Sequence, residues 1–172
     1  NVVAPFPQAA TDLEILTAVV AAVQGAGGEP FVAESAGFEF DTAATFATLR
    51  LPEWAEWLGV PLLNLDHEPH AAVAAPGWPH GKLSVARCAL EADVVINLPK
   101  LKRHNLTRVT LGIKNLMGLL DRNSRRRLHA YGLAAGIAAL AGLIRPQLTV
   151  LDALTSNTRA VYGVGRALGV VI

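Results

Sequence analysis

The feature that most constrains the fold is a short apolar run that gives way abruptly to polar and cationic residues. Val94, Val95 and Ile96 are β-branched and follow Asp93, which is the pattern of a buried strand. The next segment, up to residue 115, is rich in Lys, Arg, His, Asn and Thr. Ligands of open α/β sheets bind outside the carboxyl ends of the strands. We therefore expect an interior strand over residues 94–96 and a polar loop after it at a ligand site.

The rest of the chain alternates strand patterns with helix patterns. Strands are expected over residues 30–34, 61–65, 82–85 and 148–151. Helices are expected over residues 11–25, 43–58 and 128–144, the first capped by Thr11, and residues 70–81 are expected to form a loop. This alternation predicts one α/β domain over residues 1–172, built as three layers, with a mostly parallel sheet and helices on both faces.

Composition excludes several classes of function. The 15 Lys and Arg nearly balance the 14 Asp and Glu, so a nucleic-acid-binding role is not expected. The single cysteine, Cys88, excludes a disulfide framework and a four-cysteine iron–sulfur cluster within this chain. Neither a signal peptide nor an 18-residue apolar span is visible, which predicts a cytoplasmic protein without membrane contact. Because the chain starts at Asn1 without a Met, we expect a longer protein with ends or loops missing.

The segment from Ala92 to Gly118 resembles the signature of a bacterial and archaeal family called domain of unknown function 362. The matching positions are Asp93, Ile96, Asn97, Pro99, Lys100, Lys102, His104, Leu106, Thr107, Thr110, Lys114, Asn115 and Gly118. Weaker likeness extends to Glu34 and Ser35, to His129 and to residues 148–154. The resemblance implies an α/β fold and a site, without naming a reaction. Some members of the family carry a ferredoxin-like segment, which implies an iron–sulfur partner for a chain that lacks one.

The order of His104, Lys114 and His129 also resembles a second family, the nickel-dependent lactate racemases. In that family a Lys anchors a nickel pincer cofactor, one His binds the nickel, and other His residues act as acid and base. The small-residue turn before the Lys is absent here, where Leu111, Gly112 and Ile113 precede Lys114. The resemblance implies one cleft shared by the Lys and both histidines. It leaves the cofactor unnamed, with a transition metal held by His104 and His129 as one alternative.

These observations lead to one site hypothesis. Lys114, in an apolar frame, is the expected anchor, and His104 and His129 are the expected acid and base groups. His129 is expected at the start of a helix, where the dipole would favour its neutral form. The expected ligand-binding residues are Asn97, Lys100, Lys102, Thr107, Thr110, Asn115, Ser35 and Asp152.

The ligand expected at this site is a small anion, a carboxylate or a phosphate. The first functional hypothesis is a cofactor- or metal-dependent enzyme. The alternative is a non-catalytic ligand-binding or redox-accessory domain that works with a ferredoxin-like partner. Asp66, His67 and Glu68 match no standard metal-ligand spacing and are interpreted as a solvated loop. The oligomeric state and the substrate remain open at this point.

Overall fold

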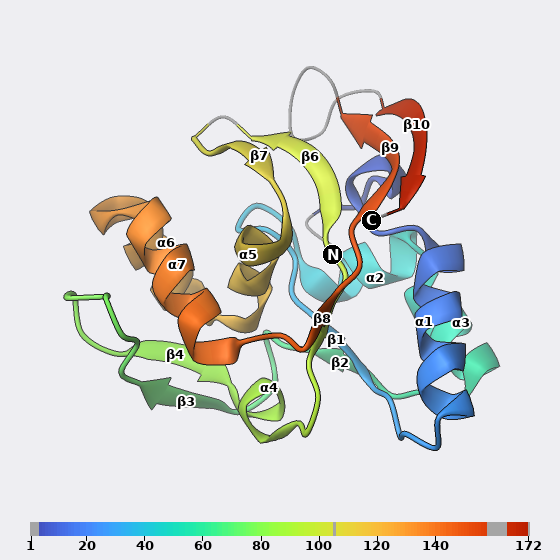
Figure 1. Cartoon of the computed structure of the whole chain (residues 1–172), viewed down its shortest axis with the longest axis horizontal. Coiled ribbons are helices and arrows are strands. Elements are labelled where there is room, and N and C mark those ends of the chain that lie inside the picture. Colours follow the sequence, from blue (N-terminus) through green and yellow to red (C-terminus); the bar gives the residue numbers. More distant parts are fainter. Residues whose placement is uncertain (1–3, 105, 158–164, 172) are drawn as a thin grey trace.

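The computed structural model describes residues 4–104, 106–157 and 165–171 (Figure 1). The helices are α1 (Leu13–Gly25), α2 (Thr42–Thr48), α3 (Leu51–Leu58), α4 (Arg87–Glu91), α5 (Gly112–Asn115), α6 (Arg122–Tyr131) and α7 (Leu133–Ile144), with 3-10 turns η1 (Pro7–Ala9) and η2 (Leu116–Leu119). The strands are β1 (Val32–Glu34), β2 (Leu62–Asn64), β3 (His70–Val73), β4 (Leu83–Ala86), β5 (Ile96–Asn97), β6 (Lys100–His104), β7 (Arg108–Thr110), β8 (Leu148–Thr149), β9 (Asp152–Asn157) and β10 (Gly165–Val171). The predicted α/β class is confirmed.

The strands of the described residues form four small sheets. The pairs β1–β2, β5–β8 and β6–β9 are parallel, and the pairs β3–β4, β6–β7 and β9–β10 are antiparallel. Backbone hydrogen bonds from Val150 to Asn97 and from Asp152 to Pro99 join β5–β8 to β6–β9. These two sheets therefore form one long parallel pair of chain segments. The predicted three-layer arrangement, with one mostly parallel sheet between helices on both faces, is not confirmed.

The strand expected at residues 94–96 begins two residues later than predicted. Val94 lies outside β5 and is 58% exposed, and Val95 is partly buried against the core. Within the described part of the chain, β5 pairs with β8 along one edge and with no strand along the other. An interior position for this strand is therefore not confirmed.

Two apolar clusters form the core. One joins α1, α2 and α3 through Leu16, Phe46 and Trp54, with Val32 of β1 packed against it. The other joins β4, η2, α6 and α7 through side chains such as Val85, Leu120 and Leu140. Figure 1 shows α1 and α3 together on one side of the molecule and α6 with α7 on the other. The segment from β5 to α5 runs between these two groups.

Three local predictions are wrong. The N-cap of α1 is Asp12, which accepts from the Glu14 amide, whereas the Thr11 hydroxyl donates to the Leu98 carbonyl oxygen. Residues 70–73, expected in a loop, form β3, which pairs with β4. The helix expected over 128–144 is divided at Gly132, whose φ of 140° interrupts the helical backbone.

Candidate functional site

The polar segment that follows β5 forms a β-hairpin, so the prediction of a loop there is wrong. Lys102, Arg103 and His104 of β6 pair with Thr110, Val109 and Arg108 of β7 in antiparallel register. Arg108 has a φ of 62°, a left-handed conformation that occurs in tight turns. Alternation along β6 turns Lys100 and Lys102 into the interior and leaves Arg103 exposed. Two of the lysines in this cationic segment are therefore buried.

Lys100 and Asp152 form a buried ion pair with each other. Their side chains are 2% and 0% exposed, and Lys100 Nζ lies 2.8 Å from Asp152 Oδ2. The Asp152 carboxylate also accepts from the backbone amides of Asp12 and Leu154. The sequence pattern predicts that both residues contact the ligand. Instead, they join β6 to β9 and to the start of α1, and neither lines the pocket described next.

A cavity of about 180 Å³ lies beside the hairpin, at the carboxyl end of β1. Its lining includes Lys102 and His104 from β6, Lys114 from α5 and His129 from α6. The remaining lining residues are Glu34, Ser35, Ala36, Gly37, Phe38, Glu39, Thr110, Asn115, Met117, Gly118 and Arg125. The structure thus brings His104, Lys114 and His129 together from three elements.

The ring of His104 has one nitrogen engaged by the hairpin. Its Nδ1 accepts from the backbone amides of Leu106 and Thr107, at 3.1 Å and 3.3 Å. A nitrogen that accepts is unprotonated, so the proton of the neutral ring lies on Nε2. Burial, together with the positive charges of Lys114, His129 and Lys102, lowers the pKa of His104 to about 4. At neutral pH this side chain therefore offers an Nε2–H donor.

The ring of His129 has the opposite arrangement. Its Nδ1 lies 2.9 Å from the Arg125 carbonyl oxygen, which can only accept, so Nδ1 carries the proton. Nε2 is then the atom left to accept a proton or a hydrogen bond. His129 is in the last turn of α6, so its predicted place at a helix start is wrong, and the dipole argument does not apply. Phe38 packs edge-on against this ring at 5.1 Å between centroids.

Two lysines contribute further charge. Lys102 is 1% exposed, and its Nζ donates to the Ala9 carbonyl oxygen at 2.8 Å. Burial lowers the pKa of Lys102 to about 7, although the charge of Glu34 acts in the opposite direction. Burial also lowers the pKa of Lys114. The Nζ of Lys114 lies 3.9 Å from the Met117 sulfur, a weak acceptor, and forms no ion pair within the described residues.

Arg125 lines the pocket and is not among the residues that the sequence pattern predicts there. It is 5% exposed, donates to the Ala36 carbonyl oxygen and pairs with Asp66, while its Nε has no partner in the described part of the chain. The guanidinium also lies 5.7 Å from the centre of the Phe38 ring. The run of three arginines at residues 125–127 indicates a cation in this region, but the sequence does not show which of the three side chains turns inward.

Asp66 holds Arg125 in place, so its assignment to a solvated loop is wrong. Its carboxylate binds Arg122 and Arg125 at 2.7 Å and 3.1 Å and accepts from the Thr42 hydroxyl. Burial raises the pKa of Asp66, but the hydrogen bonds and charges of these partners outweigh it and lower that pKa overall. Asp66 therefore supports the wall of the pocket.

The other predicted ligand residues divide into two groups. Ser35, Thr110 and Asn115 line the pocket. Asn97 and Thr107 do not line the pocket. Asn97 donates to the Gly112 carbonyl oxygen and accepts from Asn115, and the Thr107 hydroxyl donates to Val109 within the hairpin. These two side chains position α5 and the hairpin around the pocket.

The residues of the pocket that the structure describes form no metal site of the usual kind. Within the described ranges, no three His, Cys, Asp or Glu side chains are grouped as metal ligands. His104 and His129 each have Nδ1 directed to the backbone, which leaves two nitrogens for an ion that takes four ligands in most protein sites. The predicted transition metal therefore gains no support from these residues.

Comparison with known proteins gives the chain a family. The model of a domain of unknown function, DUF362, matches residues 1–171. A thylakoid-associated protein of Synechocystis sp. is 31% identical over 159 residues, which cover 89% of this chain and 48% of that protein. The chain thus spans about half the length of this relative. Among the described helices, none combines the length and apolar character needed to cross a bilayer.

This relative is named as thylakoid-associated, and the expected cytoplasmic location is not confirmed for this chain. The family match covers nearly every residue and includes the segment from Ala92 to Gly118 in which the resemblance is densest. The chain belongs to the DUF362 family.

Proposed function

We propose that the pocket lined by His104, Lys114, Arg125 and His129, called the anion pocket below, binds a small carboxylate or phosphate. The observation that carries this proposal is Lys114, a cation in the pocket lining without an ion-pair partner among the described residues. Lys114 has no carboxylate partner among the described residues, and the buried Nε of Arg125 has no acceptor there. An anion in the cavity would give Lys114 a partner, because a largely buried donor without a good acceptor is costly.

The size of the cavity limits the ligand. A volume of about 180 Å³ equals the space of about six water molecules in the liquid. This suits a phosphate or a short carboxylate, and a nucleotide or a peptide of several residues would not fit wholly within it. Glu34 lines the same cavity, and it would favour ligands that also carry a hydroxyl or amino group as donor.

The experiment is a calorimetric titration of the protein with inorganic phosphate, sulfate and malonate. Lys114→Ala should weaken anion binding at least tenfold and leave the melting temperature without ligand nearly unchanged. Lys82→Ala is the matched control, because Lys82 is exposed and absent from the pocket lining. Equal affinity in wild type and Lys114→Ala would refute the proposal. A large fall in melting temperature would assign Lys114 a structural role instead.

A second step of the proposal is proton transfer on a bound carboxylate. The two histidines present complementary atoms in their neutral forms, Nε2–H on His104 and bare Nε2 on His129. One acid and one base near the same ligand are the requirement for such catalysis. The test is incorporation of solvent deuterium into small 2-hydroxy and 2-amino carboxylates, followed by NMR. Anion binding without any turnover would favour the alternative of a non-catalytic domain that works with an iron–sulfur partner.

A further inference from the structure

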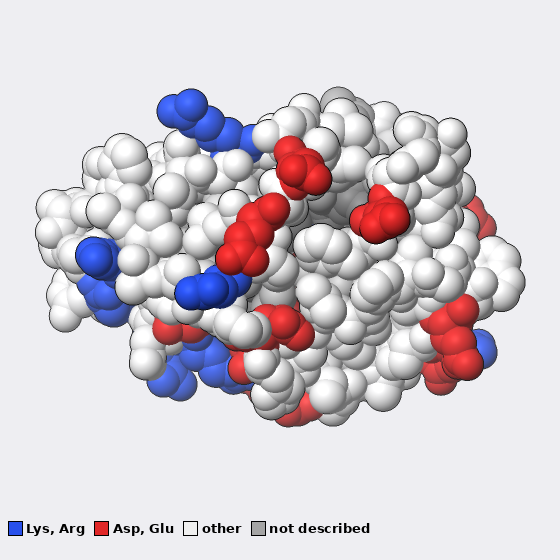
Figure 2. Space-filling model, turned by 90° about the horizontal axis from the view of Figure 1, so that it is seen from below, with Lys and Arg blue, Asp and Glu red and all other residues white. Residues whose placement is uncertain are grey.

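The surface charge of the protein does not select a ligand of one sign. Figure 2 shows the face of the molecule seen from below, on which Asp and Glu side chains are spread with Lys and Arg among them. With 15 Lys and Arg against 14 Asp and Glu, the chain as a whole is nearly neutral. Long-range attraction therefore favours neither anions nor cations, and the choice of ligand depends on the groups inside the anion pocket.

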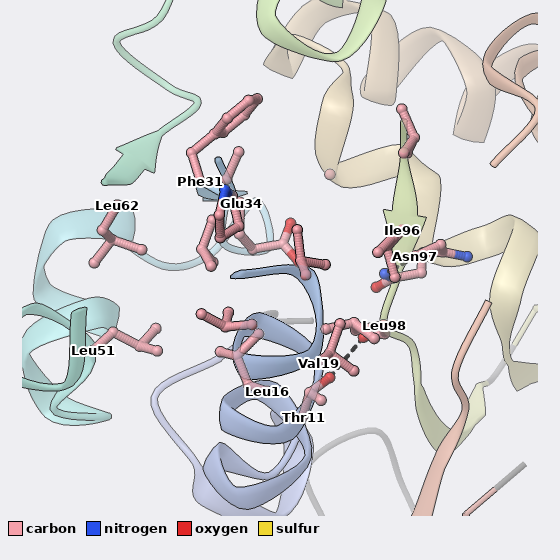
Figure 3. Close-up of a pocket in the computed structure, with 18 of the residues that line it drawn as sticks. Thr11, Leu16, Val19, Phe31, Glu34, Leu51, Leu62, Ile96, Asn97 and Leu98 are labelled. Atoms are coloured by element: carbon pink, nitrogen blue, oxygen red, sulfur yellow. Dashed lines mark hydrogen bonds between the residues drawn. The ribbon is translucent and has the colours of Figure 1, made fainter. Parts of the chain in front are cut away.

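Besides its cations, the anion pocket contains a buried carboxylate. Glu34, at the carboxyl end of β1, lines the pocket and is 8% exposed. The same side chain lines a larger, mostly apolar cleft between β1 and β5, where Figure 3 shows it across from Ile96 and Asn97. Glu34 therefore belongs to the wall between two cavities. Because like charges repel, an anionic ligand alone does not explain a negative charge at this place.

Backbone groups fix the position of this carboxylate. Its Oε1 accepts from the Ser35 amide at 2.9 Å, and the Ser35 hydroxyl donates to the Gly118 carbonyl oxygen at 2.7 Å. Gly118 has no side chain, and a Cβ there would collide with Glu34 Oε1. A carboxylate has about four acceptor positions, so Glu34 can bind a donor of the ligand in addition to its protein partners.

Glu34 and Lys114 are separate charges within one pocket. Lys114 forms no ion pair with Glu34 or with another carboxylate of the described residues. Burial lowers the pKa of Lys102 and that of Arg125; the charge of Glu34 opposes this effect at Lys102, and the charges of Asp66 and Glu34 oppose it at Arg125. The pKa of Lys114 is lowered by burial without an opposing contribution from Glu34. The carboxylate thus acts on Lys102 and Arg125, and Lys114 lies farther from it.

We propose that the ligand of the anion pocket is a small zwitterion, an α-amino acid, with its carboxylate at Lys114 and its ammonium group at Glu34. This ligand class rests on the anion binding proposed above, and Glu34 is the residue that determines it. A hydrogen bond between an ammonium group and a carboxylate is charge-assisted and about twice as strong as a neutral one. The volume of about 180 Å³ suits an amino acid with a short side chain, such as glycine or alanine.

The experiment is a calorimetric titration with propionate, lactate and alanine, which carry hydrogen, hydroxyl or ammonium at the same carbon. The wild-type protein should bind alanine about tenfold or more tightly than propionate, with lactate between them, because only alanine gives Glu34 a charged donor. Malonate, titrated in parallel, reports on anion binding alone. Equal affinity for alanine and propionate, with malonate bound, would overturn the zwitterion and leave the anion binding intact. If malonate and all three monocarboxylates fail to bind, both proposals are wrong.

Glu34→Gln tests the role of the carboxylate, because it keeps the size of the side chain and removes its charge. Alanine should bind this variant about tenfold more weakly. Malonate should bind it as tightly as wild type or more tightly, since a like charge is removed. Glu39→Gln is the matched control, because Glu39 lines the same pocket but is exposed, and it should change either affinity by less than about threefold.

The two ligands also separate a specificity role of Glu34 from a structural one. A parallel loss of alanine and malonate affinity in Glu34→Gln would overturn the proposal and assign the carboxylate to the support of Lys102 and Arg125. If Glu34→Gln does not fold, the comparison of alanine with propionate in the wild-type protein decides the question, because it needs no variant.

Discussion

Lys100 and Asp152 neutralise each other in the interior, with 2.8 Å between Nζ and Oδ2 and both side chains fully buried. The two residues are 52 positions apart and join β6 to β9. Because Asp152 also accepts from the amide of Asp12, the N-cap residue of α1, this carboxylate links three elements. The pair therefore serves the fold, and its loss is expected to affect stability before ligand binding.

Lys100→Met should lower the free energy of unfolding by about 3–5 kcal/mol, because it leaves a buried carboxylate without its cation. Urea unfolding gives the value directly. The control is Arg87→Ala, which breaks an exposed helix pair with Glu91 and should cost about 0.5 kcal/mol or less. A loss below about 1 kcal/mol in Lys100→Met would show that the Asp152 carboxylate is adequately solvated or protonated without Lys100.

Local sequence patterns predict much of the secondary structure. The expected helix over residues 43–58 is found as α2 and α3, and the apolar runs at Leu62 and Leu83 form strands, because helix periodicity and short apolar runs depend on near neighbours. The inward direction of Lys100 and Lys102 could not be predicted in this way. Their partners, Asp152 and the Ala9 carbonyl oxygen, are 52 and 93 positions away.

The predicted site is only partly recovered, for the same reason. His104 and Lys114 belong to one dense motif, and His129 lines the same cavity, although it lies in the last turn of α6 and not at the expected helix start. Arg125 is missed because its direction depends on Asp66, 59 positions earlier. The end of the helix at Gly132 is missed because apolar residues continue on both sides of it. Long-range partners, and not local propensity, decide these features.

Lys102 should give the protein a pH-dependent stability above neutrality. Its pKa is about 7 when folded, whereas the ordinary value is 10.5, so the unfolded chain binds more protons between these values. Stability relative to Lys102→Met should therefore rise as the pH increases from about 7 to about 10. Unfolding free energies at several pH values test this, with Lys82→Met as the exposed control. A difference that stays constant over this window would contradict the low pKa.

Gly118→Ala should destabilise the protein by about 1–3 kcal/mol. A Cβ at this position would collide with the carboxylate of Glu34, which is buried and bonded to the Ser35 amide. Gly142→Ala is the matched control, because a Cβ there meets nothing within 4 Å and Gly142 lies inside α7. That change should stabilise the helix by about 0.5–1 kcal/mol. Thermal unfolding of both variants tests the pair, and equal effects would show that Glu34 moves aside freely.

His104 provides the most direct test of the electrostatics of the anion pocket. Burial and the charges of Lys114, His129 and Lys102 lower its pKa to about 4, whereas the ordinary value is 6.5. Between these values the unfolded chain binds the extra proton, so the contribution of His104 to stability is present above pH 6.5 and is lost as the pH falls towards 4.

An NMR titration of the ring should give a midpoint near 4 in wild type. In Lys114→Met the midpoint should move up, because one positive charge is removed. Bound phosphate or malonate should also raise it, since a nearby anion favours the imidazolium form. A midpoint near 6.5 that neither Lys114→Met nor an anion changes would show that His104 is solvated away from the lysines, and the proposed pocket chemistry would then be wrong.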